Sequence, residues 1–182
     1  LHSNKIFFIN KISKKKLFGD GLITNVRNLA IGILTADCAP ILFFEAKKNI
    51  IGIAHAGWRG AYKKIGLKMI NYFKKKGGKL NDIFAVIGPC ISQNNYEIKN
   101  DFKAKFLKQS PKNKKHFKII KSKIYFDLKG YIFEQLKNAG LTNIEIIKKD
   151  TFKPKNNFFS ARRSMKNKIN DYGRNISIIM IK

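Results

Sequence analysis

Residues 29–58, LAIGILTADCAPILFFEAKKNIIGIAHAGW, decide how this chain folds. They hold three apolar runs, near 29–35, 41–45 and 50–55, which are rich in β-branched and aromatic residues and are separated by polar turns. Short apolar runs bounded by turn residues are typical of buried strands. We therefore expect three strands in succession in this stretch.

The segment that follows, residues 60–78, carries a clear helical pattern. Lysines lie on one face, and glycines at positions 77 and 78 end the pattern. Apolar residues recur at helical spacing on the other face: Ile65, Met69, Ile70 and Phe73. This periodicity predicts an amphipathic helix with one buried face.

The rest of the chain mixes further helices and strands. A helix is expected over 94–109, starting near an asparagine cap, and another over 126–141, between a cap at Asp127 and a stop at Gly140. Strands are expected over 83–92, 143–149 and 173–182, and loops over 110–123 and around 157–163.

Strands in succession with helices inserted singly indicate a layered α/β or α+β domain, without the regular alternation of a doubly wound sheet. With 182 residues, 44% of them hydrophobic, the chain is expected to form one domain over 1–182. Its apolar runs are far shorter than the roughly 20 residues that a membrane span needs. We expect no membrane association and a cytoplasmic location. Because the sequence opens at Leu1 rather than at methionine, we also expect the domain to lack its N-terminal strands.

The chain is strongly basic, with a formal net charge of +27. Such a charge is often the footprint of a nucleic-acid interface. Here the lysines are scattered through every segment, and their runs lack the interleaved aromatic residues that stack bases. We therefore expect a solvated lysine-rich surface and no nucleic-acid partner. A nucleic-acid-binding module would instead bind DNA tightly and with a strong salt dependence.

Only five of the 38 basic residues are arginine, and four of these lie within two positions of Gly, Trp or Ser: Arg59, Arg162, Arg163 and Arg174. Arginine in a lysine-rich chain indicates that a planar fork of donors is needed, and carboxylate or phosphate is its natural partner. The alternative is an internal brace that donates to backbone carbonyls.

Cys38 in TADC and His55 in HAGWRG each close an apolar run, beside Pro40 and Gly57 respectively. If their strands form an up-and-down unit, the two side chains lie near opposite ends unless the turns bring them together. A paired Cys and His supports either an activated thiol nucleophile or a zinc site, which needs a third ligand. Each residue also has a purely structural reading, as a small buried thiol or a hydrogen-bonded histidine.

Five motifs occur in a fixed order along the chain: TADCAPILFF, GIAHAGWRGAYKKI, IGPCIS…YEI, FDLKGYIFEQL and FFSARR…GRNISIIMI. Together they resemble the multicopper polyphenol oxidoreductase (laccase-like) family, whose members are described as zinc-dependent purine nucleoside phosphorylases. The resemblance implies an α+β fold of layered mixed β-sheets flanked by helices. It also implies adenosine, inosine, guanosine and methylthioadenosine as substrates, phosphorolysis to the base and ribose 1-phosphate, and adenosine deamination as a further activity.

The same resemblance implies a zinc triad of His2, Cys38 and His55 with one position open to reactants. Cys38 and His55 are the catalytic residues that the resemblance implies. From its chemistry, Arg59 is a third candidate catalytic residue and the first candidate for binding phosphate, with Arg162 or Arg163 second. Trp58 is expected either to stack on the purine or to brace the turn.

Two other chemistries remain open at this point. The older reading of the family, a polyphenol oxidase, would use copper in place of zinc, but three N and S ligands are too few for the several coppers of a true laccase. A thiol hydrolase would use Cys38 and His55 without any metal. Cys90 is expected in the core near the site, and Ala161 stands where family members commonly carry an aromatic residue or histidine, so ring contact with substrate is lost there.

Overall fold

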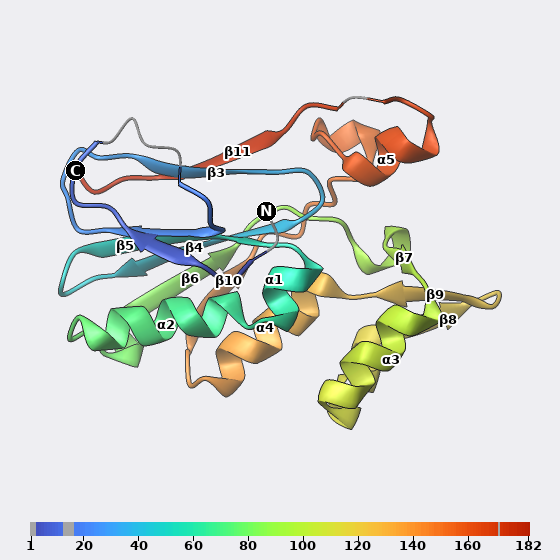
Figure 1. The fold of residues 1–182 in the computed structure, drawn as a ribbon, viewed down its shortest axis with the longest axis horizontal. Coiled ribbons are helices and arrows are strands. Elements are labelled where there is room, and N and C mark those ends of the chain that lie inside the picture. The colour runs from blue at the N-terminus through green and yellow to red at the C-terminus, as the bar shows by residue number, and fades with distance from the viewer. Residues whose placement is uncertain (1–2, 13–16, 171) are drawn as a thin grey trace.

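A mixed sheet of six strands forms the middle layer of the molecule, with strand order β1-β2-β5-β4-β6-β10 (Figure 1). The computed structural model describes residues 3–12, 17–170 and 172–182. In this sheet β1 pairs with β2, and β10 with β6, in parallel, while the central pairs are antiparallel. The strands are β1 (Ile6–Phe8), β2 (Gly21–Thr24), β4 (Ala39–Glu45), β5 (Ile50–Ala56), β6 (Ile83–Ile87) and β10 (Asn143–Ile146).

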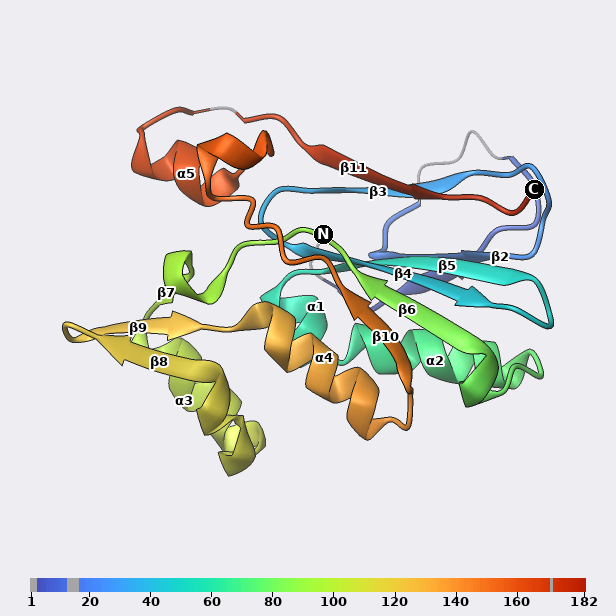
Figure 2. The ribbon, with the colours of Figure 1, turned by 180° about the vertical axis from the view of Figure 1, so that it is seen from behind.

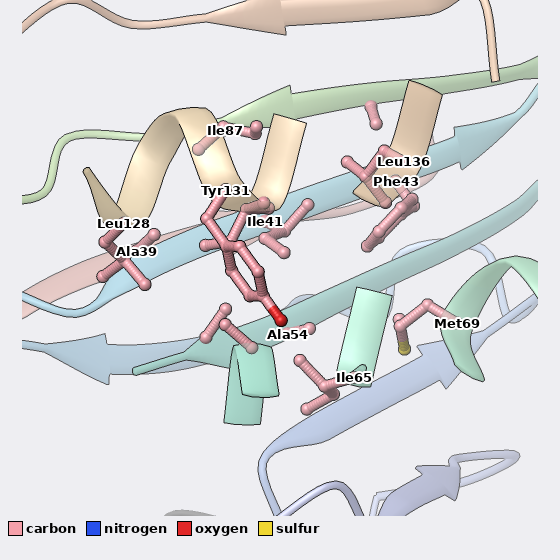
Figure 3. Close-up of a cluster of buried hydrophobic side chains, with 14 of the residues drawn as sticks. Ala39, Ile41, Phe43, Ala54, Ile65, Met69, Ile87, Leu128, Tyr131 and Leu136 are labelled. Carbon is pink, nitrogen blue, oxygen red and sulfur yellow. The ribbon is translucent and has the colours of Figure 1, made fainter. Parts of the chain in front are cut away.

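Helices cover one face of this sheet, as Figures 1 and 2 show from opposite sides. They are α1 (Trp58–Tyr62), α2 (Ile65–Lys75) and α4 (Leu128–Asn138). Side chains alternate along β4, so that Ile41 and Phe43 face the helices and are fully buried there (Figure 3). On β5, Gly52 keeps α2 close, because a Cβ at this position would stand 2.5 Å from the terminal carbon of Met69.

A second, two-stranded sheet covers the opposite face of the six-stranded sheet (Figures 1 and 2). It pairs β3 (Ile31–Thr35) with β11 (Asn175–Ile179) in antiparallel fashion. Between the two sheets lies a separate apolar cluster of Ile31, Ile51, Ile53 and Ile181. The three strands expected in 29–58 are therefore confirmed, but the first of them belongs to a different layer from the other two.

An extension beside α1 and α4 carries α3 and a small sheet (Figure 2). This three-stranded sheet, ordered β7-β9-β8, packs with α3 through a cluster of aromatic rings that includes Phe102, Phe106 and Phe126. The elements of the extension are β7 (Glu97–Ile98), α3 (Asn100–Gln109), β8 (Phe117–Ile120) and β9 (Lys123–Phe126). The short helix α5 (Ala161–Lys166) lies on the β11 side of the molecule (Figures 1 and 2). Short 3₁₀ turns occur at Leu80–Asp82, Gln93–Asn95, Pro111–His116 and Pro154–Asn156.

This is the α+β class expected from the sequence, with layered mixed sheets flanked by helices. The expected strands over 83–92, 143–149 and 173–182 are confirmed as β6, β10 and β11. Within the described ranges, no helix combines the length and the apolar character that a membrane crossing requires.

The helix expected over 60–78 is broken into two. Lys64, between α1 and α2, adopts the left-handed conformation with φ of 60°, and the helix axis restarts after it. The spacing of apolar residues does not reveal a single residue in the left-handed conformation. Lysine gives no other signal, because it has no marked preference for that conformation.

The helix expected over 94–109 begins late, at Asn100, and Lys99 rather than an asparagine occupies its N-cap position. The preceding residues are used elsewhere: β7 pairs with β9, and the Tyr96 carbonyl accepts a hydrogen bond from the Phe126 amide at 3.1 Å. Pairing across the chain thus overrides the local helical pattern.

The expected loops also contain structure. Residues 110–123 hold a 3₁₀ turn and β8, which forms a hairpin with β9 through Lys121 and Ser122, both at positive φ (47° and 64°). Two-residue hairpin turns of this kind usually carry Asn-Gly, so Lys-Ser gave no signal. The segment around 157–163 contains the start of α5, and two strands that were not expected, β1 and β2, lie before residue 29.

The predicted cap of α4 is confirmed, because Oδ1 of Asp127 accepts a hydrogen bond from the Gly130 amide at 2.9 Å. Replacing Asp127 with alanine is expected to lower the free energy of unfolding by about 1 kcal/mol, because the Gly130 amide in the first turn of α4 loses its hydrogen-bond acceptor. Urea denaturation measures this. Asp101→Ala, at an exposed position in the first turn of α3, is the control and should change stability by less than about 0.5 kcal/mol. Equal losses in both variants would contradict the capping role.

Candidate metal and substrate site

The β4–β5 hairpin brings Cys38 and His55 to the same end of the six-stranded sheet. Cys38 immediately precedes β4, and the antiparallel register pairs Ala39 with Ala56 and Pro40 with His55. The condition under which the thiol and the imidazole would lie near opposite ends is therefore not met, because Cys38 begins one strand of the hairpin rather than ending the strand before it.

His55 faces the gap between the two sheets. Ile51 and Ile53 on the same strand belong to the apolar cluster under β3 and β11, and alternation places His55 on their side. A cleft of about 430 Å³ opens here, lined by His55, Asp20 and residues 32–34 of β3. A small molecule can thus approach the imidazole between the layers.

Asp20, just before β2, holds the His55 ring. Its Oδ1 lies 2.8 Å from His55 Nδ1, and its backbone carbonyl accepts a hydrogen bond from the His55 amide at 2.7 Å. The Ser3 amide donates to Oδ2 of the same carboxylate at 2.5 Å. A carboxylate on one ring nitrogen is the usual means of orienting a histidine that ligates a metal through the other. Sequence reasoning missed Asp20, although a buried carboxylate in a chain with only 11 acidic residues is a distinctive feature.

The protonation states at this end of the hairpin follow from burial and from the carboxylates. Burial alone would raise the pKa of Asp20, but hydrogen bonds from Ser3 and His55 lower it. Burial lowers the pKa of His55, against the opposing effect of Asp20, so the imidazole is neutral near pH 7. Neutral imidazole is the form that binds metals.

The surroundings of Cys38 favour the protonated thiol over the thiolate. Burial first, and then the carboxylates of Asp37 and Asp20, raise its pKa to about 12. Activated cysteine nucleophiles have pKa values below that of free cysteine, so this environment does not support a metal-free thiol hydrolase. Coordination to a metal deprotonates a thiol outright.

Trp58 and Arg59 begin α1, directly after β5. The guanidinium of Arg59 is exposed and lies over the indole ring, 4.9 Å from its centroid. The indole also packs against Phe102 at a centroid distance of 4.9 Å. Trp58 therefore packs against the start of α3 and also contacts the Arg59 guanidinium.

The two neighbouring arginines of SARR have different surroundings. Arg163 donates to three backbone carbonyls, those of Thr151, Phe152 and Phe158, which matches the internal-brace alternative. Arg162 donates one hydrogen bond to the Glu97 carbonyl at 3.0 Å and lies over the Tyr96 ring, 5.4 Å from its centroid.

Arg162 and Trp58 line one cavity of about 270 Å³, together with Tyr96. The amide of Arg162 donates to the Asp37 carboxylate at 2.7 Å, so a residue that lines this cavity is bonded directly to the TADC segment. Cys90 lies in the core, fully buried, as expected.

The third expected zinc ligand, His2, lies outside the described residues. Across ranges 3–12, 17–170 and 172–182, no group of three His, Cys, Asp or Glu side chains could hold a metal ion. The two donors that can be described, a thiol and a carboxylate-oriented imidazole, suit zinc in type and are too few for a site of several coppers.

The model of one family, multi-copper polyphenol oxidoreductase laccase, matches residues 1–182. The chain belongs to this family. A solved relative, YfiH of Bacillus licheniformis, superposes with a TM-score of 0.89 at 29% sequence identity, covering 100% of this chain and 72% of that one.

Named relatives within the family carry enzymatic descriptions. A protein of Rickettsia prowazekii named purine nucleoside phosphorylase is 34% identical over 184 residues, which is 100% of this chain and 76% of the relative. A protein from an unknown prokaryote named adenosine deaminase is 29% identical over 154 residues, covering 79% of this chain and 56% of the relative.

Proposed function

We propose that this chain forms a zinc-dependent purine nucleoside phosphorylase, which acts on adenosine, inosine, guanosine and methylthioadenosine and also deaminates adenosine. The observation that carries the proposal is the convergence of Cys38 and His55 at one end of the β4–β5 hairpin, with Asp20 on the imidazole. The named relatives support the same reaction class. We take residues 1–182 as one domain of this type.

His2, Cys38 and His55 are the proposed zinc ligands. Ser3, the neighbour of His2, donates its amide to the carboxylate that orients His55, which supports a role for this end of the chain at the site. Bound zinc supplies a Lewis acid at this position. Asp20 keeps the His55 ring in place and fixes its hydrogen-bonded nitrogen as Nδ1.

Side chains of this protein are also proposed to bind the phosphate and the purine. Phosphate must be held against the sugar carbon while the glycosidic bond breaks, and a guanidinium suits this task because it can donate two parallel hydrogen bonds to the anion. Arg59 and Arg162 are the proposed phosphate ligands, since both border Trp58. Trp58 is the proposed stacking surface for the purine, and Arg163 is assigned to bracing.

Both cysteines are free thiols, which supports a cytoplasmic location.

Assay of inosine with and without inorganic phosphate tests the proposal. Hypoxanthine and ribose 1-phosphate are expected only when phosphate is present, and a chelator should stop their release until zinc is returned. Adenosine should in addition yield inosine. Turnover that needs copper and oxygen would favour a polyphenol oxidase, and activity that survives chelation but is lost on thiol alkylation would favour a thiol hydrolase. Either result would overturn the phosphorylase assignment.

A further inference from the structure

We propose that Asp37 is a positioning residue, which holds Arg162 so that its guanidinium faces the cavity beside the TADC segment and binds phosphate there. The inference rests on the proposed function, because it assigns a part in phosphate binding to a residue outside the implied zinc and arginine set.

The Asp37 carboxylate joins the TADC segment to the start of α5. Oδ2 accepts hydrogen bonds from the Arg162 amide at 2.7 Å and from the Ser160 hydroxyl at 3.0 Å. Oδ1 accepts a third from the Thr151 hydroxyl at 2.7 Å. The side chain is only 8% exposed, so these bonds are shielded from water. Residues that are distant in the sequence are thereby fixed against the neighbour of Cys38.

The backbone at Asp37 indicates that this side chain is needed. Its φ is 76°, in the left-handed region that favours glycine. Holding a non-glycine residue there costs conformational energy, and such residues cluster where surrounding contacts specify them. The contacts here are the three hydrogen bonds to the carboxylate, together with one that the Asp37 carbonyl accepts from the Ile91 amide at 3.0 Å.

By fixing the first turn of α5, Asp37 determines which of two adjacent arginines faces the cavity. With the first turn of α5 fixed by Asp37, the Arg163 guanidinium donates to the carbonyls of the segment 151–158. Arg162 projects differently, onto Tyr96 and the Glu97 carbonyl, and lines the cavity that Trp58 also borders. A rotated or loosened first turn would move the guanidinium away from this cavity.

A second cavity, of about 460 Å³, adjoins the first at Arg162 and Glu97 and is lined in addition by Lys123 and Lys166. Lys123 is paired with the Glu97 carboxylate at 3.0 Å, so the net positive charge of this second cavity comes from Arg162 and Lys166. That charge favours an anion at Arg162. Phosphate is the anion that the proposed reaction requires.

The variant that tests the inference is Asp37→Gly, because glycine keeps the left-handed backbone while the carboxylate is removed. The zinc-loaded protein should bind inorganic phosphate roughly tenfold more weakly or worse in isothermal titration calorimetry, with a parallel rise in the KM for phosphate. The KM for inosine and the zinc content should stay close to those of the wild type. Thermal unfolding establishes that the variant is folded.

Two companion variants separate positioning from simple stability. Asp37→Asn can retain all three hydrogen bonds, since its amide oxygen can accept from Arg162 and Ser160 while its NH₂ group donates to the Thr151 hydroxyl. It should recover phosphate binding to within about threefold of the wild type. Thr151→Val removes one bond from the carboxylate but leaves the bond to Arg162, and should likewise leave phosphate affinity unchanged.

A double-mutant cycle makes the test specific to Arg162. If Asp37 acts through that residue, Asp37→Gly should weaken phosphate binding in the wild-type background but not in an Arg162→Ala background. Wild-type phosphate affinity in folded Asp37→Gly, or damage by Asp37→Asn equal to that by glycine, would overturn the inference. Wild-type protein that binds no phosphate would overturn it as well. Phosphate binding without release of base from nucleosides would overturn only the proposed function.

Discussion

Replacing Cys38 with alanine is expected to remove the metal and abolish phosphorolysis. Cys38 is one of the two proposed ligands that lie at the same end of the β4–β5 hairpin. Losing it leaves only two of the three proposed protein ligands, so the fall in metal affinity should exceed the roughly 100-fold change that loss of an orienting partner causes. Zinc per chain by elemental analysis, and the rate of hypoxanthine release from inosine, measure the effect.

Cys90→Ala is the matched control. This second cysteine is fully buried and its sulfur lies 3.7 Å from the Ile91 carbonyl, so its loss should leave zinc content unchanged and affect stability alone. A Cys38→Ala protein that retains one zinc per chain with unchanged turnover would eliminate the proposed site. Equal zinc loss in both variants would point to a general effect of losing a buried thiol.

Replacing Asp20 with alanine is expected to weaken zinc binding by about 10- to 100-fold while leaving every proposed ligand in place. The reason is geometric: the His55 ring loses the carboxylate that lies 2.8 Å from Nδ1, and the Ser3 amide loses its acceptor as well. Competition with a chromophoric chelator measures the affinity, and activity at limiting zinc should fall in parallel.

Asp82→Ala serves as the control for this experiment. Asp82 forms a surface ion pair with Lys47 at 3.5 Å, near the end of β4 away from Cys38. Its loss should change zinc affinity by less than about twofold, because its ion pair lies at the far end of β4 and touches none of the proposed ligands. Unaltered zinc affinity in folded Asp20→Ala would show that the carboxylate does not orient a ligand.

Much of the architecture can be predicted from local patterns in the sequence. The β-branched runs of 29–58 predicted three strands, and all three are present. The four apolar residues from Ile65 to Phe73 predicted the buried face of α2 and are all buried in the structure. The cap at Asp127 and the left-handed stop at Gly140, with φ of 88°, were predicted in place. Each of these features depends on residues close together in the sequence.

The errors have two sources. Lys121 and Ser122 adopt positive φ in the two-residue turn between β8 and β9, and Lys64 does so between α1 and α2, but none of these residue types signals that conformation. By contrast, residues 97 and 98 leave a helical pattern to pair with β9. Conformations set by distant partners leave little trace in a short window of sequence.

The sequence by itself determined the family and the layered class of fold, and it singled out Cys38, His55, Trp58 and Arg59 as candidate site residues, because these are carried by contiguous motifs. Only the tertiary structure decided which residues orient and support them. Asp20 reaches His55, and Asp37 reaches Arg162, through contacts between segments far apart in the chain. Likewise β3 leaves its neighbours in sequence to pair with β11 at the other end of the chain. The physical reason is that hydrogen bonds and strand pairing between distant segments depend on how the layers stack, whereas periodicity and motifs record only what neighbouring residues prefer.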